Sequence, residues 1–255
     1  MLTLSSAFDV VGLLGRNIKS INNIISLTHD LDSSRNYPKK ILYPKEFFPH
    51  SNPTHQAMVN EYVAVLEAFL GVKKTEFSLV ERWAQYPPPE AEGKSLKDYL
   101  NKAAFAIQCH DYYQIFKPYR EQYRNNFDKA PYAGPIVEFR WYLNNALQHK
   151  IARADDCGRS TGESVTVEEA AEHHDQLRVF REWFNSNVMG AKGDLLSDAI
   201  MILPYGGPRP KYRDAPNEPP SGSNTIGEKF MSPILQAPQL VLPSVSPNLV
   251  SQVSN

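Results

Sequence analysis

In the first third of the chain, the spacing of apolar residues is typical of a helix in some stretches and of a strand in others. Residues after Gly15 recur at helical spacing and predict a short amphipathic helix that ends near His29. A buried strand, KILYP at 40–44, follows, and a helix capped by Thr54 then leads to a second strand, TEFSLV at 75–80. Strand, helix and strand in this order are typical of an α/β layer with a right-handed crossover. The apolar stripe expected on the helix after Thr54 consists of Met58, Tyr62, Leu66 and Phe69.

The middle of the chain has a helical pattern interrupted by prolines. One long helix is predicted over 95–127, with a kink or break at Pro118, and another over 136–150. Thr166 and Glu169 have the spacing of a capping box and predict the start of a further helix. The apolar face expected on that helix consists of Leu177, Phe180, Phe184 and Val188.

The last third predicts strands separated by irregular chain. DAIMILP, at 198–204, is a short apolar run of the kind that forms a central strand in an α/β sheet. The segment at 205–224 is rich in Pro and Gly and is expected to be irregular, and QAPQLVLP, at 236–243, is a second buried-strand candidate. We therefore predict an α/β fold with one domain over 1–243 and a flexible tail over 244–255.

The composition is that of an ordinary globular protein and argues against several classes of partner and location. Of 255 residues, 42% are apolar and 22% charged, and the net charge of −1 gives no electrostatic basis for a nucleic-acid or membrane partner. Cys109 and Cys157 make neither a disulfide framework nor a metal-binding spacing, which favours a reducing, cytoplasmic setting. No apolar run is long enough to span a bilayer.

Clusters of reactive side chains do not by themselves predict an enzyme. His173 and His174 are adjacent, and neighbours on a helix point about 100° apart, so a solvated face is favoured over a metal site. Cys109, His110 and Asp111 are likewise consecutive rather than brought together by the fold. The glycine-containing stretches lack the complete phosphate-loop motifs, and no GxSxG occurs.

Three segments resemble the amidase signature family. SSAFDVVGLLGRNIKSINNII is similar to the segment S-F-D-T-V-G-x-x-A-R-x-x-x-x-L of those enzymes. SDAIMILP is similar to the strand F-D-A-L-L-x-P, and ILQAPQLVLPSV to a later strand G-x-P-x-x-x-x-P. PKYRD, at 210–214, and the long helices suggest the fungal branch. The matching residues of the first segment are Ser6, Phe8, Asp9, Val11, Gly12 and Arg16.

The resemblance implies part of a mixed β-sheet flanked by helices, and carbon–nitrogen amide hydrolysis without a cofactor. The family uses a Lys, a cis-configured Ser and a nucleophilic Ser, all of which lie ahead of the first segment. Here only MLTL precedes that segment, and no GSSGGS-like loop occurs. We therefore expect a C-terminal, substrate-side half that is inactive alone. Because the other half supplies strands, its absence would expose a sheet edge. Either a protein partner covers this edge, or the fragment is marginally stable, or the predicted start at Met1 is wrong.

Two alternatives to this reading stay open. The chain is either a non-catalytic pseudo-amidase, which binds small molecules or acts as a scaffold, or a degenerate product without function. If an amide substrate binds, the loop after Pro204 is expected at a strand end, where ligands of α/β folds bind. The predicted pocket-rim residues are Tyr205, Arg209 and Tyr212, for which an ordinary surface loop is the competing interpretation.

Overall fold

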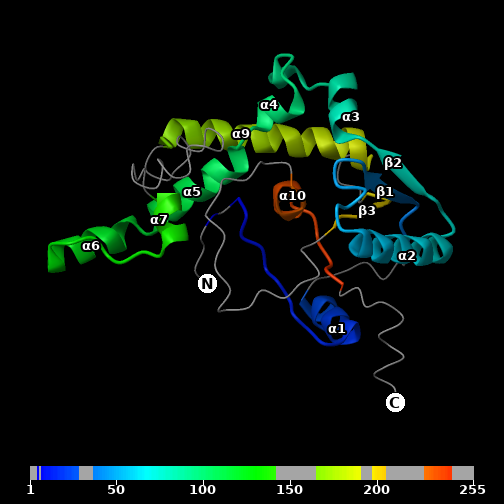
Figure 1. Ribbon diagram of the computed structural model, residues 1–255, viewed down its shortest axis with the longest axis horizontal. Coiled ribbons are helices and arrows are strands. Elements are labelled where there is room, and N and C mark those ends of the chain that lie inside the picture. The colour runs from blue at the N-terminus through cyan, green and yellow to red at the C-terminus, as the bar shows by residue number, and fades with distance from the viewer. Residues whose placement is uncertain are drawn as a thin grey trace.

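The computed structural model is built on a small parallel sheet (Figure 1). The strands β1 (Lys40–Pro44), β2 (Lys74–Phe77) and β3 (Ala199–Met201) lie in the order β2-β1-β3. Ile41 of β1 is in register with Lys74 on one side and with Ile200 on the other. The α/β class and the strand predicted within DAIMILP are thereby confirmed. The structure describes residues 5, 7–28, 37–141, 165–190, 197–204 and 227–242.

Helices cover both faces of this sheet. The helix α2 (Pro53–Leu70) lies along one face, and α9 (Val167–Phe184) crosses on the other (Figure 1). Successive β1 side chains point to opposite faces. Ile41 and Tyr43 therefore join Val63 of α2 in one cluster, whereas Leu42 packs in the larger cluster that contains the apolar residues of α9. The result is a three-layer α/β/α arrangement.

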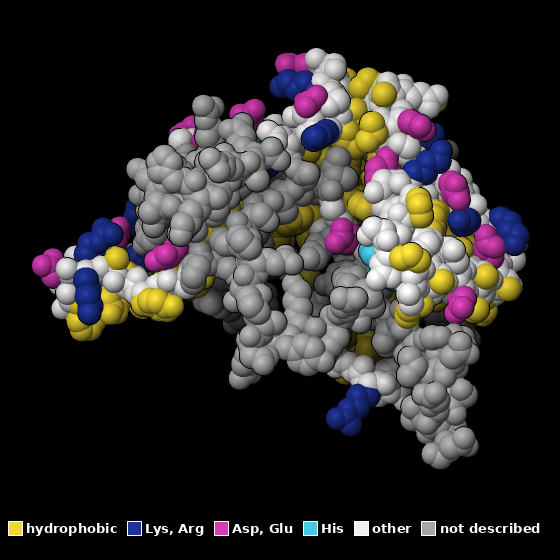
Figure 2. Space-filling model, in the orientation of Figure 1, with side chains coloured by type: hydrophobic (Ala, Val, Ile, Leu, Met, Phe, Trp, Pro, Cys, Tyr) yellow, Lys and Arg dark blue, Asp and Glu magenta, His cyan; other side chains and the backbone are white. Residues whose placement is uncertain are grey.

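Details of α2 differ from the predicted helix. Its N-cap is Asn52 rather than Thr54, because the Asn52 side chain accepts a hydrogen bond from the His55 amide at 3.0 Å and Pro53 occupies the first turn. The predicted stripe is also partly wrong, since Phe69 is 66% exposed and Tyr62 is exposed as well. Figure 2 shows hydrophobic side chains on the visible surface around α2, mixed with charged ones. The residues that pack toward the sheet are Val59, Val63, Leu66 and Leu70.

The long helix predicted over 95–127 is divided into several shorter ones. They are α4 (Leu96–Leu100), α5 (Ala103–Ile115) and α6 (Lys117–Phe127). One break falls at Asn101, which has a positive φ of 38°, and the other falls at Phe116, just before Pro118 in the first turn of α6. The bounds of the remaining elements before α9 are α1 (Ile18–Thr28), α3 (Leu79–Gln85), η1 (Pro89–Ala91) and α7 (Pro135–Trp141).

The main core lies where α3, α4 and α5 pack with α9. Trp83 of α3 is 1% exposed, and its ring centroid lies 4.9 Å from Trp183 and 5.4 Å from Tyr99. The capping box that starts α9 is present, with both hydrogen bonds between Thr166 and Glu169. The predicted α9 face is buried as expected, and its last residue, Val188, lies in the π-helical turn η3 (Asn185–Met189).

The segment predicted as the strand QAPQLVLP is not a strand where the structure describes it. After α10 (Glu228–Leu235), residues 237–242 pair with none of the described strands, and Leu240 is 61% exposed. An apolar run becomes a strand only when a neighbouring strand accepts its backbone hydrogen bonds. The tail at 244–255 lies outside the described residues.

The predicted helix after Gly15 is present as α1, but it buries none of its residues. Its apolar stripe is therefore not explained by packing within the described part of the chain. Among the described residues, no helix combines the length and the apolar character that crossing a bilayer demands.

Candidate functional site

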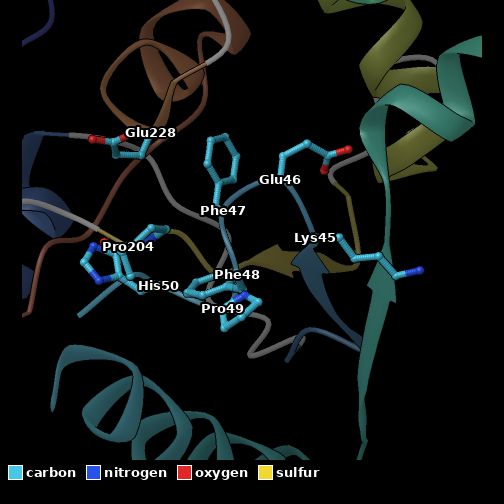
Figure 3. A pocket seen from close by; sticks show the side chains of 9 residues that line it. Lys45, Glu46, Phe47, Phe48, Pro49, His50, Pro204 and Glu228 are labelled. Carbon is cyan, nitrogen blue, oxygen red and sulfur yellow. The ribbon is translucent and has the colours of Figure 1, made fainter. Parts of the chain in front are cut away.

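A cavity of about 330 Å³ lies at the carboxyl ends of β1 and β3 (Figure 3). The loop at 45–51, directly after β1, forms most of its wall. Pro204 follows β3 and Glu228 is the first residue of α10, so three segments far apart in the sequence meet there. This volume is at the lower end of the range for small-molecule pockets.

The position of the cavity in the fold is a favourable one for a ligand. The chain leaves β1 through α2 to reach β2 on one side, and it later reaches β3 on the other side after α9. Helices that cover opposite faces leave a crevice between the two central strands at their carboxyl ends. In the strand order β2-β1-β3, that crevice lies beside β1 and β3, where the cavity is found.

The first residues of the loop are held by the neighbouring strand and helix. The Lys45 amide donates a hydrogen bond to the Phe77 carbonyl at 2.9 Å, which continues the pairing of β1 with β2. The Glu46 carboxylate accepts hydrogen bonds from the Ser78 hydroxyl at 2.6 Å and from the Val80 amide at 3.1 Å. Glu46 therefore helps to cap α3, and its negative charge is stabilised by the positive N-terminal end of the helix dipole.

His50 is held at the far end of the loop in a defined tautomer. Its amide donates to the Gln56 side-chain oxygen at 2.6 Å, and the Gln56 amide group donates to the Tyr43 hydroxyl at 2.9 Å. The ring nitrogen Nδ1 of His50 lies 3.0 Å from the Asn52 amide and accepts its hydrogen bond. Because Nδ1 is the acceptor, the proton of the neutral ring resides on Nε2.

A second imidazole lies behind His50. The ring of His55 is buried, with its centroid 4.2 Å from that of His50. Burial lowers the pKa of His55, and the nearby His50 lowers that pKa further, because a second positive charge beside it is unfavourable. The pair is therefore most stable when His55 is neutral.

Acidification is expected to destabilise the fold through His55. The pKa of His55 is lower in the folded than in the unfolded chain. At a pH above both values His55 is neutral in both states, so the free energy of unfolding does not depend on its protonation there. As the pH falls below the unfolded value near 6.5, the unfolded chain takes up a proton before the folded chain does, and the free energy of unfolding decreases by at most about 1.4 kcal/mol per pH unit. Urea unfolding between pH 8 and pH 5 measures this slope.

The matched variants for this experiment are His55→Gln and His174→Gln. His55→Gln is expected to reduce the pH dependence, whereas His174→Gln, on the partly exposed face of α9, is expected to leave it unchanged. An equal slope in the wild type and in His55→Gln would contradict the assignment.

A second polar cluster joins the first segment of the chain to α5. The buried Ser5 hydroxyl donates to Asp111 Oδ2 at 2.5 Å, and Asp111 Oδ1 lies 3.2 Å from His110 Nδ1. The hydroxyl is thus bonded to a carboxylate and not to the imidazole, so the cluster lacks the nucleophile–base contact of acyl-transfer sites. Cys109 is buried in α5. The cluster fastens the first segment to α5.

The structure bears on only some of the residues predicted from the sequence. Tyr205, Arg209 and Tyr212 lie outside the described residues. His173 contacts Gln176 at 2.9 Å, and in the described part of the chain no group of His, Cys, Asp or Glu is arranged to hold a metal.

Sequence reasoning did not single out His50 and Glu228, two ionisable residues that line the cavity. The signal for His50 was its place shortly after the buried strand KILYP. Glu228 had no such signal, because only the fold brings α10 to this cavity.

No family model matches the chain, and no solved structure matches it significantly.

Proposed function

We propose that this chain is the substrate-side part of an amidase-signature domain and shapes the pocket for a small carboxylic amide. The proposal starts from the three segments that resemble that family. Its substrate site is the cavity at the carboxyl ends of β1 and β3.

The observation that carries the proposal is that α10 connects these three segments beside the cavity. The Phe8 ring, in the first segment, packs against Phe230 of α10 with centroids 5.6 Å apart. The second segment ends at Pro204, which lines the same cavity as Glu228, and α10 leads directly into the third segment. The three segments are thus connected through α10, and the second of them reaches the cavity at Pro204, which supports a shared functional role.

The proposal assigns binding, and not acyl chemistry, to these residues. In the family, Lys relays a proton through the bridging Ser to activate the nucleophile, and the tetrahedral intermediate forms beside a glycine-rich oxyanion hole. No GSSGGS-like stretch occurs among the 255 residues. A segment that carries the Lys and both Ser would have to meet the cavity from outside this chain.

An alternative proposal is a non-catalytic module that binds a small molecule or acts as a scaffold. One observation favours it: the buried Ser5 hydroxyl donates to Asp111, which contacts His110, and therefore is not bonded to the imidazole. Under this alternative, the cavity binds a small molecule without cleaving an amide bond.

A protein partner that covers exposed apolar surface is part of the proposal. The described sheet ends in β2 and β3, and α1 exposes Ile18 and Leu27. Open edges and uncovered apolar helix faces favour association with another protein surface. The few cysteines support a cytoplasmic location for such an assembly.

Hydrolysis assays test the proposal. The purified chain alone is expected to release no ammonia or amine from a panel of small amides. The chain joined to a segment carrying the Lys and the serine-rich loop is expected to turn over at least one of them, and Lys→Ala in that segment is expected to abolish turnover. Turnover by the 255-residue chain alone, or none by a folded joined chain, would contradict the proposal.

A further inference from the structure

We propose that His50 and Glu228 form a donor–acceptor pair that selects a neutral carboxamide over the corresponding carboxylate. This inference rests on the proposed function, since it concerns the same cavity. It identifies the residues that would distinguish an amide from an acid there.

His50 supplies the donor. Its Nδ1 accepts the Asn52 amide hydrogen bond, which leaves the proton on Nε2. Among the described residues, Nε2 has no hydrogen-bond partner of its own, and the ring is half-buried in the cavity wall. A carbonyl oxygen of a ligand is a suitable acceptor for this N–H.

Glu228 supplies the acceptor. It begins α10, which is anchored by the buried Met231 and by the contact of Phe230 with Phe8. No described residue forms an ion pair or a hydrogen bond with its carboxylate. In Figure 3, Glu228 and His50 lie on the same side of the cavity, next to Pro204.

The charges around the cavity favour a neutral ligand. Lys45 extends to the opposite side in Figure 3, away from Glu228, and Glu46 is engaged at the start of α3. Glu228 therefore has no nearby cation in the described wall to offset its charge. A carboxylate ligand offers acceptors alone and is repelled, whereas a primary amide offers one acceptor and an NH₂ donor.

Part of the wall, which is otherwise polar, offers apolar side chains to a hydrophobic substituent. Phe48 and Pro204 are buried, and Phe47 is half-buried at the cavity. Aromatic side chains bind aromatic ligand groups through large contact areas and favourable ring geometry. Benzamide and benzoate, which differ only in the group that the pair recognises, are therefore suitable probes.

Titration of the full chain with each probe, followed by NMR or calorimetry, tests the pair. Benzamide is expected to bind at least about tenfold more tightly than benzoate, because a hydrogen bond to a charged group and a repulsion distinguish them. Glu228→Gln removes the charge with little change in shape and is expected to abolish this preference. Glu61→Gln, an exposed acid on α2, is the matched control and is expected to retain it.

His50→Phe provides a second variant, which keeps an aromatic ring but removes the donor. It is expected to weaken benzamide binding by about tenfold. Equal affinity for both probes in the wild type, no binding of either probe, or an unchanged preference in Glu228→Gln would overturn the inference. These outcomes leave the hydrolysis assay of the joined chain to decide the proposed function separately.

Discussion

Trp83→Ala is expected to lower the free energy of unfolding by about 3–5 kcal/mol, as for other large aromatic residues truncated in a core. The Trp83 side chain is buried between α3, α4 and α9, in contact with the rings of Tyr99, Phe180 and Trp183. Its indole N–H also donates to the Lys94 carbonyl at 3.0 Å. Truncation leaves a cavity among aromatic rings and removes the donor for that carbonyl.

Denaturant unfolding followed by circular dichroism measures this loss. Tyr132→Ala is the control, because that aromatic ring is exposed and its removal is expected to change the free energy of unfolding by no more than about 0.5 kcal/mol. Equal stability of the Trp83 and Tyr132 variants would show that the core is placed elsewhere.

Arg120→Ala is expected to cost about 2–3 kcal/mol, although the residue carries a charge. Arg120 is 4% exposed, and its guanidinium lies 3.8 Å from the Tyr113 ring centroid and 4.9 Å from that of Trp141. Its Nη2 donates to the Tyr113 carbonyl at 2.6 Å, in the last turn of α5. Cations near a helix C-terminus satisfy its carbonyls and favour its dipole.

Arg124 provides a matched control for this variant. It lies on α6 like Arg120, but its side chain is exposed, so Arg124→Ala is expected to be nearly neutral. A comparable loss of stability in both variants would indicate a general effect of charge, and would contradict the specific contacts assigned to Arg120.

Local patterns predicted those parts of the fold in which each element carries its own signal. KILYP and DAIMILP are apolar runs between turn residues, and both contribute central or neighbouring strands of the sheet. The capping box at Thr166 marked the start of α9 because both of its hydrogen bonds are local. A strand also needs a neighbouring strand, which comes from a distant part of the sequence. For this reason the apolar run QAPQLVLP alone was not sufficient to predict a strand correctly.

The candidate site was less accessible to sequence reasoning. Pro204, which follows β3, lines the cavity, whereas the loop after it, where the pocket-rim residues were predicted, lies outside the described residues. His50 depends on a tautomer that the Asn52 amide determines, and Glu228 reaches the cavity only through the packing of α10. Neither relation leaves a pattern in the linear sequence.

The central proposal, that this chain is part of an amidase-signature domain, is tested most directly by sequencing the native transcript through its 5′ end. The account predicts a reading frame that encodes a Lys and a GSSGGS-like loop together with these 255 residues, because the acyl chemistry of the family requires them. A complete frame without any such stretch would contradict the hydrolase proposal and leave the binding module as the alternative.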